Sequence, residues 1–502
     1  MTNLSRRAAL GALTGSLAPV RSRAQRQARR PNFLFLIADD HAGYALGAAG
    51  DPLADTPNLD RLAREGTRFT RHFCNSPVCT PSRQSLLTGQ LPHAVGVTRL
   101  TTPLAENKTT LAKLFQRAGY HTAVFGKMHF NRPGRPGLHG FDVCWTEREI
   151  QEGWLRDVRP SPLPEGIAVQ PPWRPLQDPA RIWLNARKLP FGRLAGEMRS
   201  DYCVTQALAY LEEKRHQTFA LWISLQEPHS PFHFPIEDRD RIDPSRCPPP
   251  RVGPEDAEQI PIVFRELSEE DKRGIRAAYY TSVHYLDRNL GRVLTKLREL
   301  DLEGNTCVVY LADHGYCLGH HGRFEKHCGY DPALSVPLIF RWPGRIAENR
   351  TIDRLTEHVD VPVTITELLD LHPLPAAEGR NLFRGPARES IFGEYTENEE
   401  VFLRTRRWKY MYCSGRRARG DGYHTSRPAP GPYERLYDLE RDPDEFFNVA
   451  PRYPQVTARL RTEILQRYRA SHPEADQEPA GTSAALEFYV RPRDIGSPRP
   501  EE

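Results

Sequence analysis

The sequence predicts an α/β fold in which helices flank a large, mostly parallel central sheet, followed by a smaller C-terminal antiparallel sheet with a helix. Two observations support this prediction. Up to about residue 385, short apolar runs alternate with segments of helical periodicity. Beyond that point, strand-like segments follow one another with turns instead of helices between them.

Four of the apolar runs have the length and composition of buried parallel strands, and they begin at Asn32, His121, Phe219 and Thr306. Each run ends abruptly in polar residues. These residues are Asp39, Asp40, Lys127, His129, His229, Asp313 and His314, with Lys326 in the loop after the last run. Because the carboxyl ends of parallel strands line one crevice, we expect these side chains to converge.

Helical segments separate the strands, and several carry recognisable start and stop signals. They are expected from Thr56 to Gly66, from Thr109 to Ala118, from Ser200 past Leu211, from Ser268 to about Leu300, from Asp360 to Leu369 and from Pro454 to about Arg469. Residues 144–200 are rich in Pro, Trp and Arg without clean periodicity. We interpret them as a long loop region of the kind that often carries substrate specificity.

The segment from Cys79 to Arg83 predicts the start of another helix. Pro81 suits a first helical turn, Thr80 can cap it, and Gly89 suits its end. Cys79 would then lie just before a helix N-terminus, where negative charge is favoured. A lone cysteine is more often a small buried hydrophobic residue. Pro81 and Arg83 beside it, together with the polar residues at the strand ends, argue against that interpretation for Cys79.

The predicted crevice has a distinctive set of charges. Its three carboxylates repel one another unless a cation lies between them, and oxygen ligands favour Ca²⁺ or Mg²⁺ over zinc. Two lysines, an arginine and several histidines surround them, which is the composition of a pocket for a tetrahedral oxyanion.

The N-terminus differs from the rest of the chain. Residues 1–30 contain seven arginines and no acidic residue, and Ser5-Arg6-Arg7 precedes a short, weakly hydrophobic segment. This pattern resembles a twin-arginine export signal and predicts a periplasmic or extracellular protein; the alternative is a disordered basic tail. Removing these seven charges changes the formal net charge from +5 to −2, which argues against nucleic acid as a partner. No apolar run approaches the roughly 20 residues that span a bilayer.

We expect an organisation in which residues 31–384 form the catalytic domain and residues 385–470 a small α+β domain. Residues 471–502 are rich in Pro, Glu and Ala, and we expect a loosely packed tail there. The nine cysteines show no C-x-x-C spacing, which excludes zinc-ribbon and thioredoxin-like sites. Some of them could pair after export, and the sequence leaves the pairing open.

The motifs at the strand ends are similar to those of a known family. Cys79-Thr-Pro-Ser-Arg83, with Thr88-Gly89 downstream, matches the C-x-P-S-R signature of the type I, formylglycine-dependent sulfatases of the alkaline-phosphatase superfamily. The resemblance extends from about residue 32 to about residue 450. It includes Asp39-Asp40, Gly126-Lys-Met-His129, Pro228-His-Ser-Pro231, Asp313-His-Gly315, and Tyr437 to Pro443 with Asn448. It implies an alkaline-phosphatase-like fold and a sulfuric ester hydrolase acting on carbohydrate or aryl sulfate monoesters.

The resemblance also implies roles for individual residues. Cys79 would be oxidised by a formylglycine-generating enzyme, and the hydrated aldehyde would be the nucleophile. Asp39, Asp40, Asp313 and His314 would hold Ca²⁺ together with residue 79, with Mg²⁺ as the less favoured ion. Arg83 and Lys127 would stabilise the hydrate, and His129 would be the base that collapses the sulfated intermediate. His229 and Lys326 would bind sulfate and assist the leaving oxygen.

The sequence departs from the family pattern at two positions, and alternatives remain. Met128 occupies a position that is often Trp, and His314 one that is Asn in many members. His320, His321 and His327 receive no firm role, although His327 could lie near the substrate. The alternatives are a phosphonate monoester or phosphodiester hydrolase, a non-catalytic binding protein on the same fold, and a chain left unmodified in a host without the maturation enzyme. The particular ester and the oligomeric state stay open.

Overall fold

The computed structural model describes residues 30–170, 183–415, 423, 425 and 432–492. The described residues from 31 onward belong to one compact unit. Residues 1–29, most of the predicted export signal, lie outside the described part. Within the described residues, no helix is long and apolar enough to cross a membrane.

The core is an eight-stranded sheet with the strand order β4-β3-β5-β1-β6-β7-β2-β8. Its strands are β1 (Asn32–Ala38), β2 (Thr67–Phe73), β3 (His121–Gly126), β4 (Val143–Trp145), β5 (Phe219–Ser224), β6 (Thr306–Ala312), β7 (Leu338–Arg341) and β8 (Arg350–Glu357). Only β7 pairs antiparallel with its neighbours in this sheet. The predicted large, mostly parallel sheet is confirmed.

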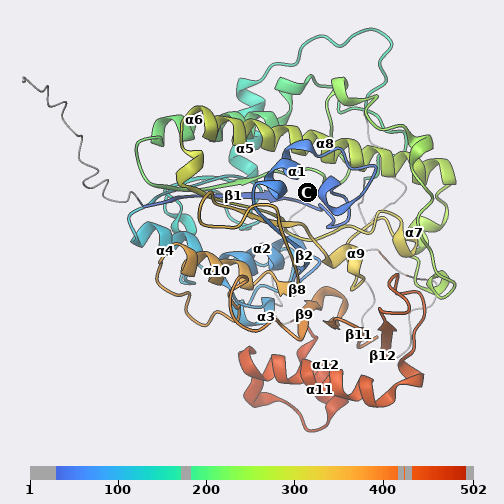
Figure 1. The fold of residues 1–502 in the computed structure, drawn as a ribbon. Helices are drawn as coiled ribbons and strands as arrows, with labels where there is room; N and C mark the ends of the chain where they lie inside the picture. Colours follow the sequence, from blue (N-terminus) through green and yellow to red (C-terminus); the bar gives the residue numbers. More distant parts are fainter. Residues whose placement is uncertain (1–29, 171–182, 416–422, 424, 426–431, 493–502) are drawn as a thin grey trace, which may run out of the picture. The chain divides into compact units, whose positions relative to one another are not determined.

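Helices cover both faces of this sheet (Figure 1). One face carries α1 (Pro57–Arg64), α5 (Glu147–Asp157), α6 (Arg199–Lys214) and α8 (Glu269–Glu299), and the other carries α2 (Cys79–Thr88), α4 (Leu111–Arg117) and α10 (Asp360–Leu368). The residues of β1 alternate between the two cores: Phe33 and Phe35 pack on the α2 side, whereas Leu34 and Leu36 pack on the α8 side. This two-sided burial explains why β1 is apolar throughout. The one-turn helices α3 (Pro92–Val95), α7 (Ile262–Arg265) and α9 (Asp331–Leu334) lie in connections.

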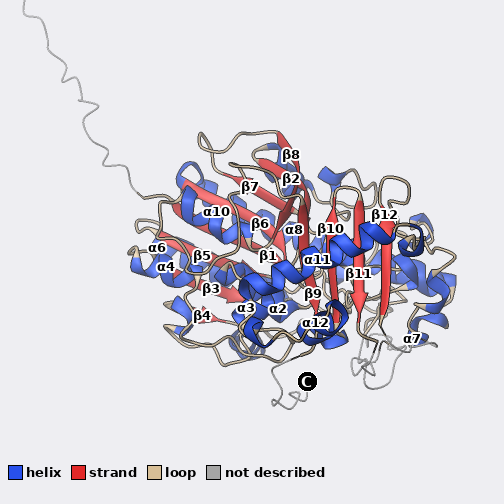
Figure 2. Cartoon of the chain, turned by 90° about the horizontal axis from the view of Figure 1, so that it is seen from below, coloured by secondary structure: helices blue, strands red, loops and turns tan. Residues whose placement is uncertain are grey.

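The C-terminal part contains the predicted antiparallel sheet, with the order β12-β11-β10-β9. Its strands are β9 (Ser390–Tyr395), β10 (Glu400–Thr405), β11 (Trp408–Cys413) and β12 (Tyr433–Asp438). Helix α11 (Pro454–Ser471) packs on it, and Figure 2 shows α11 crossing the strands.

The prediction of a loosely packed tail after residue 470 is wrong for the residues that the structure describes. Leu486 of helix α12 (Thr482–Tyr489) and Val490, the residue after the helix, are completely buried, and Tyr489 stacks on Tyr468 of α11 with ring centroids 4.7 Å apart. The buried residues Ala485, Leu486 and Tyr489 lie at helical spacing, a signal that the Pro- and Glu-rich composition of the surrounding segment obscured. Residues 493–502 lie outside the described part.

The interpretation of residues 144–200 as a long loop is also wrong in its first third. Helix α5 begins there with a capping box between Thr146 and Glu149, and it buries Ile150 and Trp154.

Strands β2 and β8 were not predicted. Both carry several polar, partly exposed residues, since β8 is an edge strand and β2 its neighbour.

Candidate active site

Helix α2 carries the cysteine on which the sequence prediction centres. Cys79 is the first helical residue rather than the one before the helix, and Val78 is the N-cap with extended backbone. Thr80 does not cap α2, because its hydroxyl donates to the Leu100 carbonyl at 2.6 Å. Gly89 ends the helix in the left-handed region as expected, with φ of 73°. Cys79 is almost completely buried, with 2% of its surface exposed.

The ends of neighbouring strands bring the polar residues to this cysteine. Strand β1 lies between β5 and β6, and Ala38 is in register with Ala312, so Asp39 and Asp313 leave the sheet side by side. The Cys79 Sγ lies 3.6 Å from Asp39 Oδ1. It is 3.2 Å from His314 Nε2 and 3.3 Å from Lys326 Nζ.

Arg83, one helical turn after Cys79, ties α2 to four strand ends, those of β1, β3, β5 and β6. Its Nε donates to Asp313 Oδ2 at 2.9 Å, and its Nη2 lies 3.2 Å from Asp39 Oδ2. Its Nη1 donates to the Lys127 carbonyl and, at 2.7 Å, to Ser224 Oγ. Sequence reasoning missed Ser224, although its position as the last residue of β5 is the same signal that identified the others.

The two lysines pair with the carboxylates of β1. Lys127 forms an ion pair with Asp39. Lys326 Nζ lies 2.7 Å from Asp40 Oδ1 and 4.0 Å from Asp39 Oδ1. The site therefore places three buried carboxylates opposite three basic side chains.

Burial and neighbouring charges shift the pKa values of these groups, upward for some and downward for others. Burial raises the pKa of Asp40 to about 7 in spite of Lys326 beside it. Burial and Asp39 act to raise the pKa of the Cys79 thiol, but Lys326, Lys127 and His314 together hold it well below its ordinary value. Burial would lower the pKa of His314, yet Asp313 and Cys79 raise it to about 9. Perturbed groups of this kind are typical of catalytic sites.

The two histidines from β3 and β5 differ in position. His229 Nδ1 donates to the Ser230 carbonyl at 2.7 Å, and the residue offers a ligand atom within 4.8 Å of those of Asp39 and Asp40. His129 forms no hydrogen bond with Cys79 in the described part of the chain. Its backbone N–H donates to Glu147 Oε1 at 2.8 Å, and its Nε2 lies 3.8 Å from the same oxygen.

The three unassigned histidines lie in the loop after β6. His321 Nδ1 bonds to Asp256 Oδ1 at 2.9 Å, and its ring stacks on Tyr330. His320 is packed near Tyr44. His327 Nδ1 is 3.6 Å from Glu325 Oε2, with the rings of Tyr395 and Tyr423 near its own. The hydrogen bond to Asp256 and the stacking on Tyr330 indicate that His321 packs the loop and does not reach the site.

Two overlapping groups of side chains have the geometry to hold a metal ion. One consists of Asp39, Cys79, Asp313 and His314, and the other of Asp39, Asp40 and His229; within each, the ligand atoms lie within 4.8 Å of one another. Three carboxylates from two strand ends fit a hard cation such as Ca²⁺. The thiol is the soft exception, because sulfur is a poor ligand for such an ion.

Comparisons with known proteins agree with this geometry. A protein-family model described as Sulfatase matches residues 31–371 of the chain. The chain is 28% identical to a choline-sulfatase of Rhizobium meliloti over 480 residues, which cover 88% of this chain and 87% of that protein. It is 26% identical to an arylsulfatase of Clostridium perfringens, over 84% of this chain and 90% of that one. The fold is similar to that of a phosphonate monoester hydrolase of Agrobacterium radiobacter, with a TM-score of 0.72, 24% identity, and coverage of 88% and 96%.

Proposed function

Since the chain belongs to the sulfatase family and is a sulfuric ester hydrolase, we propose that it acts through a formylglycine made from Cys79 and a bound Ca²⁺. The substrates we propose are carbohydrate or aryl sulfate monoesters. The observation that supports this best is the surroundings of the Cys79 Sγ, which lies within 3.6 Å of Asp39, His314 and Lys326.

Chemistry favours a modified residue at position 79. A hydrated aldehyde has two hydroxyl groups, one to attack sulfur and another to expel sulfate afterwards, whereas a thiol has a single nucleophilic atom. The hydrate would also replace the one soft donor of the site by oxygen. Arg83, Lys127 and Lys326 surround the position with positive charge that would stabilise negative oxygen there.

Asp39, Asp40, Asp313 and His314 would hold the Ca²⁺ together with residue 79. When bound, the ion would polarise the sulfate oxygens and lower the pKa of the nucleophile. The three carboxylates already face Arg83, Lys127 and Lys326, so an added dication would leave the site with net positive charge. That balance suits an anionic sulfate ester.

The remaining residues would act on the ester itself. Lys326 and His229 would bind the sulfate and assist the leaving oxygen. Because the Nδ1–H of His229 points to the Ser230 carbonyl, its Nε2 is the atom that would face the ester. His129 would be the base that collapses the sulfated intermediate, after its ring leaves Glu147.

Mass spectrometry of the peptide containing residue 79 tests the proposal directly. In enzyme from the native host we expect the aldehyde, or its hydrate, in place of the thiol. A fully active enzyme with an unmodified Cys79 would refute the mechanism. Coexpression with a formylglycine-generating enzyme, the maturation partner we propose, should raise activity in a host that lacks one.

The second candidate is a phosphonate monoester or phosphodiester hydrolase. It is favoured by one observation, the fold similarity to the Agrobacterium radiobacter enzyme. Rates on matched aryl sulfate, phosphodiester and phosphonate monoester substrates discriminate the two. A strong preference for the phosphorus esters would reverse our assignment.

We also propose that the protein is exported through its N-terminal segment, and that residues 385–470, which have a sheet of their own, form a second domain within the same compact unit as residues 31–384. Replacing Arg6 and Arg7 by lysine should retain the protein inside the cell, since paired arginines are what a twin-arginine pathway reads. Cell fractionation with an antibody to the protein measures this. An unchanged distribution would favour the basic-tail alternative.

A further inference from the structure

Two buried cysteines lie side by side in the loop that carries Lys326. The sulfur atoms of Cys317 and Cys328 are 3.5 Å apart, and the two residues are 0% and 3% exposed. Among the nine cysteines, all of which the structure describes, no other sulfur–sulfur contact is found. We propose that Cys317 and Cys328 form a disulfide that closes this loop around Lys326.

The backbone already holds the two cysteines in position. The Cys317 N–H donates to the Glu325 carbonyl at 3.0 Å, and the Cys328 N–H to the Lys326 carbonyl at 2.8 Å. The loop between them is tightened by a further bond from the Gly319 N–H to the Arg323 carbonyl at 2.7 Å. A disulfide bond is about 2.0 Å long, so the sulfur atoms need to approach by only about 1.5 Å. Side-chain rotation can supply a movement of that size.

The loop contacts the proposed active site in two ways, through Lys326 and through the apolar side chains beside α2. Lys326, two residues before Cys328, bonds to Asp40 Oδ1 and to the Cys79 Sγ. Both cysteines also pack in the apolar cluster that contains Val78, the N-cap of α2. A covalent link would therefore limit how far the Lys326 ammonium can move from residue 79.

The chemistry is a two-electron oxidation by an external disulfide. One thiolate attacks the oxidant and releases a thiol, and the other thiolate then displaces the second thiol and forms the Cys317–Cys328 bond. With glutathione disulfide, two glutathione molecules are released and each takes up one proton. Burial raises the pKa of the Cys317 thiol, so the reaction proceeds when the loop opens or while the chain folds.

Peptide mapping of the full-length protein tests the link without any activity measurement. The protein is oxidised with glutathione disulfide in two ways, in the folded state and during refolding from denaturant. Trypsin cleaves after Arg323 and Lys326, so the reduced chain yields Cys317 and Cys328 in separate peptides. The Cys317 peptide, residues 299–323, also contains Cys307, so the map is repeated on Cys307→Ala, in which the linked pair must persist. We expect one linked peptide pair, lighter by two hydrogen atoms than the sum of its parts, and two fewer free thiols.

Variants connect the link to its effect. The Cys317→Ala/Cys328→Ala protein should lose the increase in Tm that oxidation gives the wild type, because a disulfide constrains the unfolded chain. Cys307→Ala, in β6 away from the pair, should keep it. The absence of the linked peptide from both oxidised samples, or linkage of either cysteine to a third one, would overturn the proposal. Since the readouts are mass, thiol count and Tm, they fail independently of the proposed sulfatase mechanism.

Discussion

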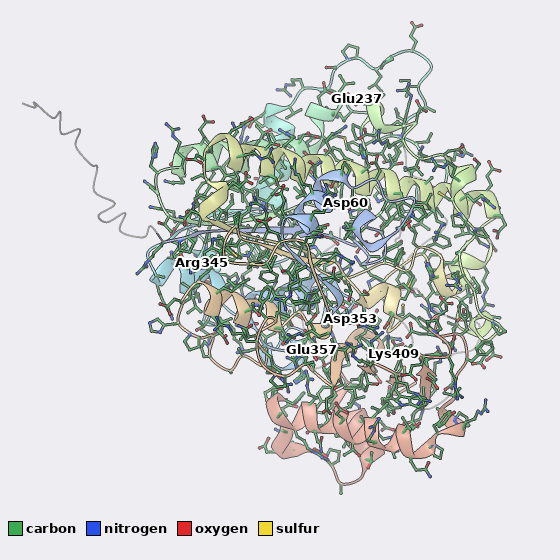
Figure 3. The ribbon with its side chains drawn as sticks, in the orientation of Figure 1. Asp60, Glu237, Arg345, Asp353, Glu357 and Lys409 are labelled. Carbon is green, nitrogen blue, oxygen red and sulfur yellow. The ribbon has the colours of Figure 1, made fainter. Side chains whose placement is uncertain are left out.

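Two buried clusters of charge in this molecule have similar composition and different character. The first is the site around Cys79. The second joins the first residue of α9 to the four-stranded sheet: Lys409 Nζ lies 2.7 Å from Asp331 Oδ1 and 3.0 Å from Glu445 Oε1, and Arg404 Nε lies 2.8 Å from Asp331 Oδ2. We call these four residues the junction cluster. Figure 3 labels Lys409, a residue of β11 in that sheet, above α11 and α12.

Two carboxylates, Asp331 of the junction cluster and Asp40 of the site, differ in how their burial is compensated. Burial would raise the pKa of Asp331, but Arg404 and Lys409 both donate to it and hold the pKa below its usual value. Burial instead raises the pKa of Asp40 to about 7, since Asp39 and Cys79 add to the effect and Lys326 offsets it only in part. The remaining acids show the reverse: burial and Asp331 raise the pKa of Glu445, whereas Lys127 and Arg83 hold the pKa of Asp39 well below its usual value in spite of burial. Each cluster therefore has one acid held ionised and one with a raised pKa, and what distinguishes the site is that Cys79 lies beside its acids, where a cation would relieve the repulsion.

The largest expected effect is on the site. Cys79→Ala should lower kcat/KM by at least about 10⁴-fold, because it removes the residue from which the proposed formylglycine nucleophile is made. Its Tm should stay close to that of the wild type, since no more than a small buried side chain is lost. Cys307→Ala, also buried, is the matched control and should retain activity. A Cys79→Ala enzyme that remains active would contradict the mechanism.

The second largest effect is expected from removing divalent cations with a chelator, which should act on the site and not on the junction cluster. Removing divalent cations should reduce activity by about 10²–10³-fold, in line with the several kcal/mol that a metal contributes to stabilising transition-state charge. Ca²⁺ should restore the rate. Because no metal is expected at the junction cluster, a chelator should leave it intact and Lys409→Met should not change the Ca²⁺ requirement. Full activity in protein shown by elemental analysis to be metal-free would exclude the ion from the mechanism.

Breaking the junction cluster should affect stability alone. Lys409→Met removes the buried lysine from Glu445 and leaves Asp331 with Arg404 as its basic partner, and should lower the free energy of unfolding by about 3–5 kcal/mol. The kcat of the folded protein should be unchanged. The control is Lys296→Met, whose partner Glu299 is exposed, with an expected change below about 1 kcal/mol. A fall in kcat without a loss of stability would show that the two clusters are coupled.

The smallest effect is expected farther from both clusters. Leu486→Ala removes a fully buried side chain of α12 and should lower the free energy of unfolding by about 2–3 kcal/mol. Denaturant titration measures this, and Glu487→Ala on the same helix should have little effect. An unchanged midpoint for Leu486→Ala would mean that α12 does not contribute to the core.

Much of this fold followed from short-range patterns. The apolar runs of β1, β3, β5 and β6 were identified because strands covered on both faces must be apolar throughout. The polar residues at their ends followed from the rule that parallel strands share one carboxyl edge. Four elements were missed, namely β2, β8, α5 and α12. The two strands carry several polar, partly exposed residues and so lack a continuous apolar run, and the two helices lie in segments whose overall Pro, Arg or Glu content indicated loops.

The sequence by itself determined which residues could form the site, because the Cys79 to Arg83 segment and the strand-end acids are local features. The tertiary structure decided how they meet. Strand order places Asp39 beside Asp313, and Arg83 reaches four strand ends at once, neither of which any local pattern contains. It also turned His129 toward Glu147 and set Cys317 against Cys328. Contacts between residues far apart in the chain depend on packing, and so they appear only once the whole chain has folded.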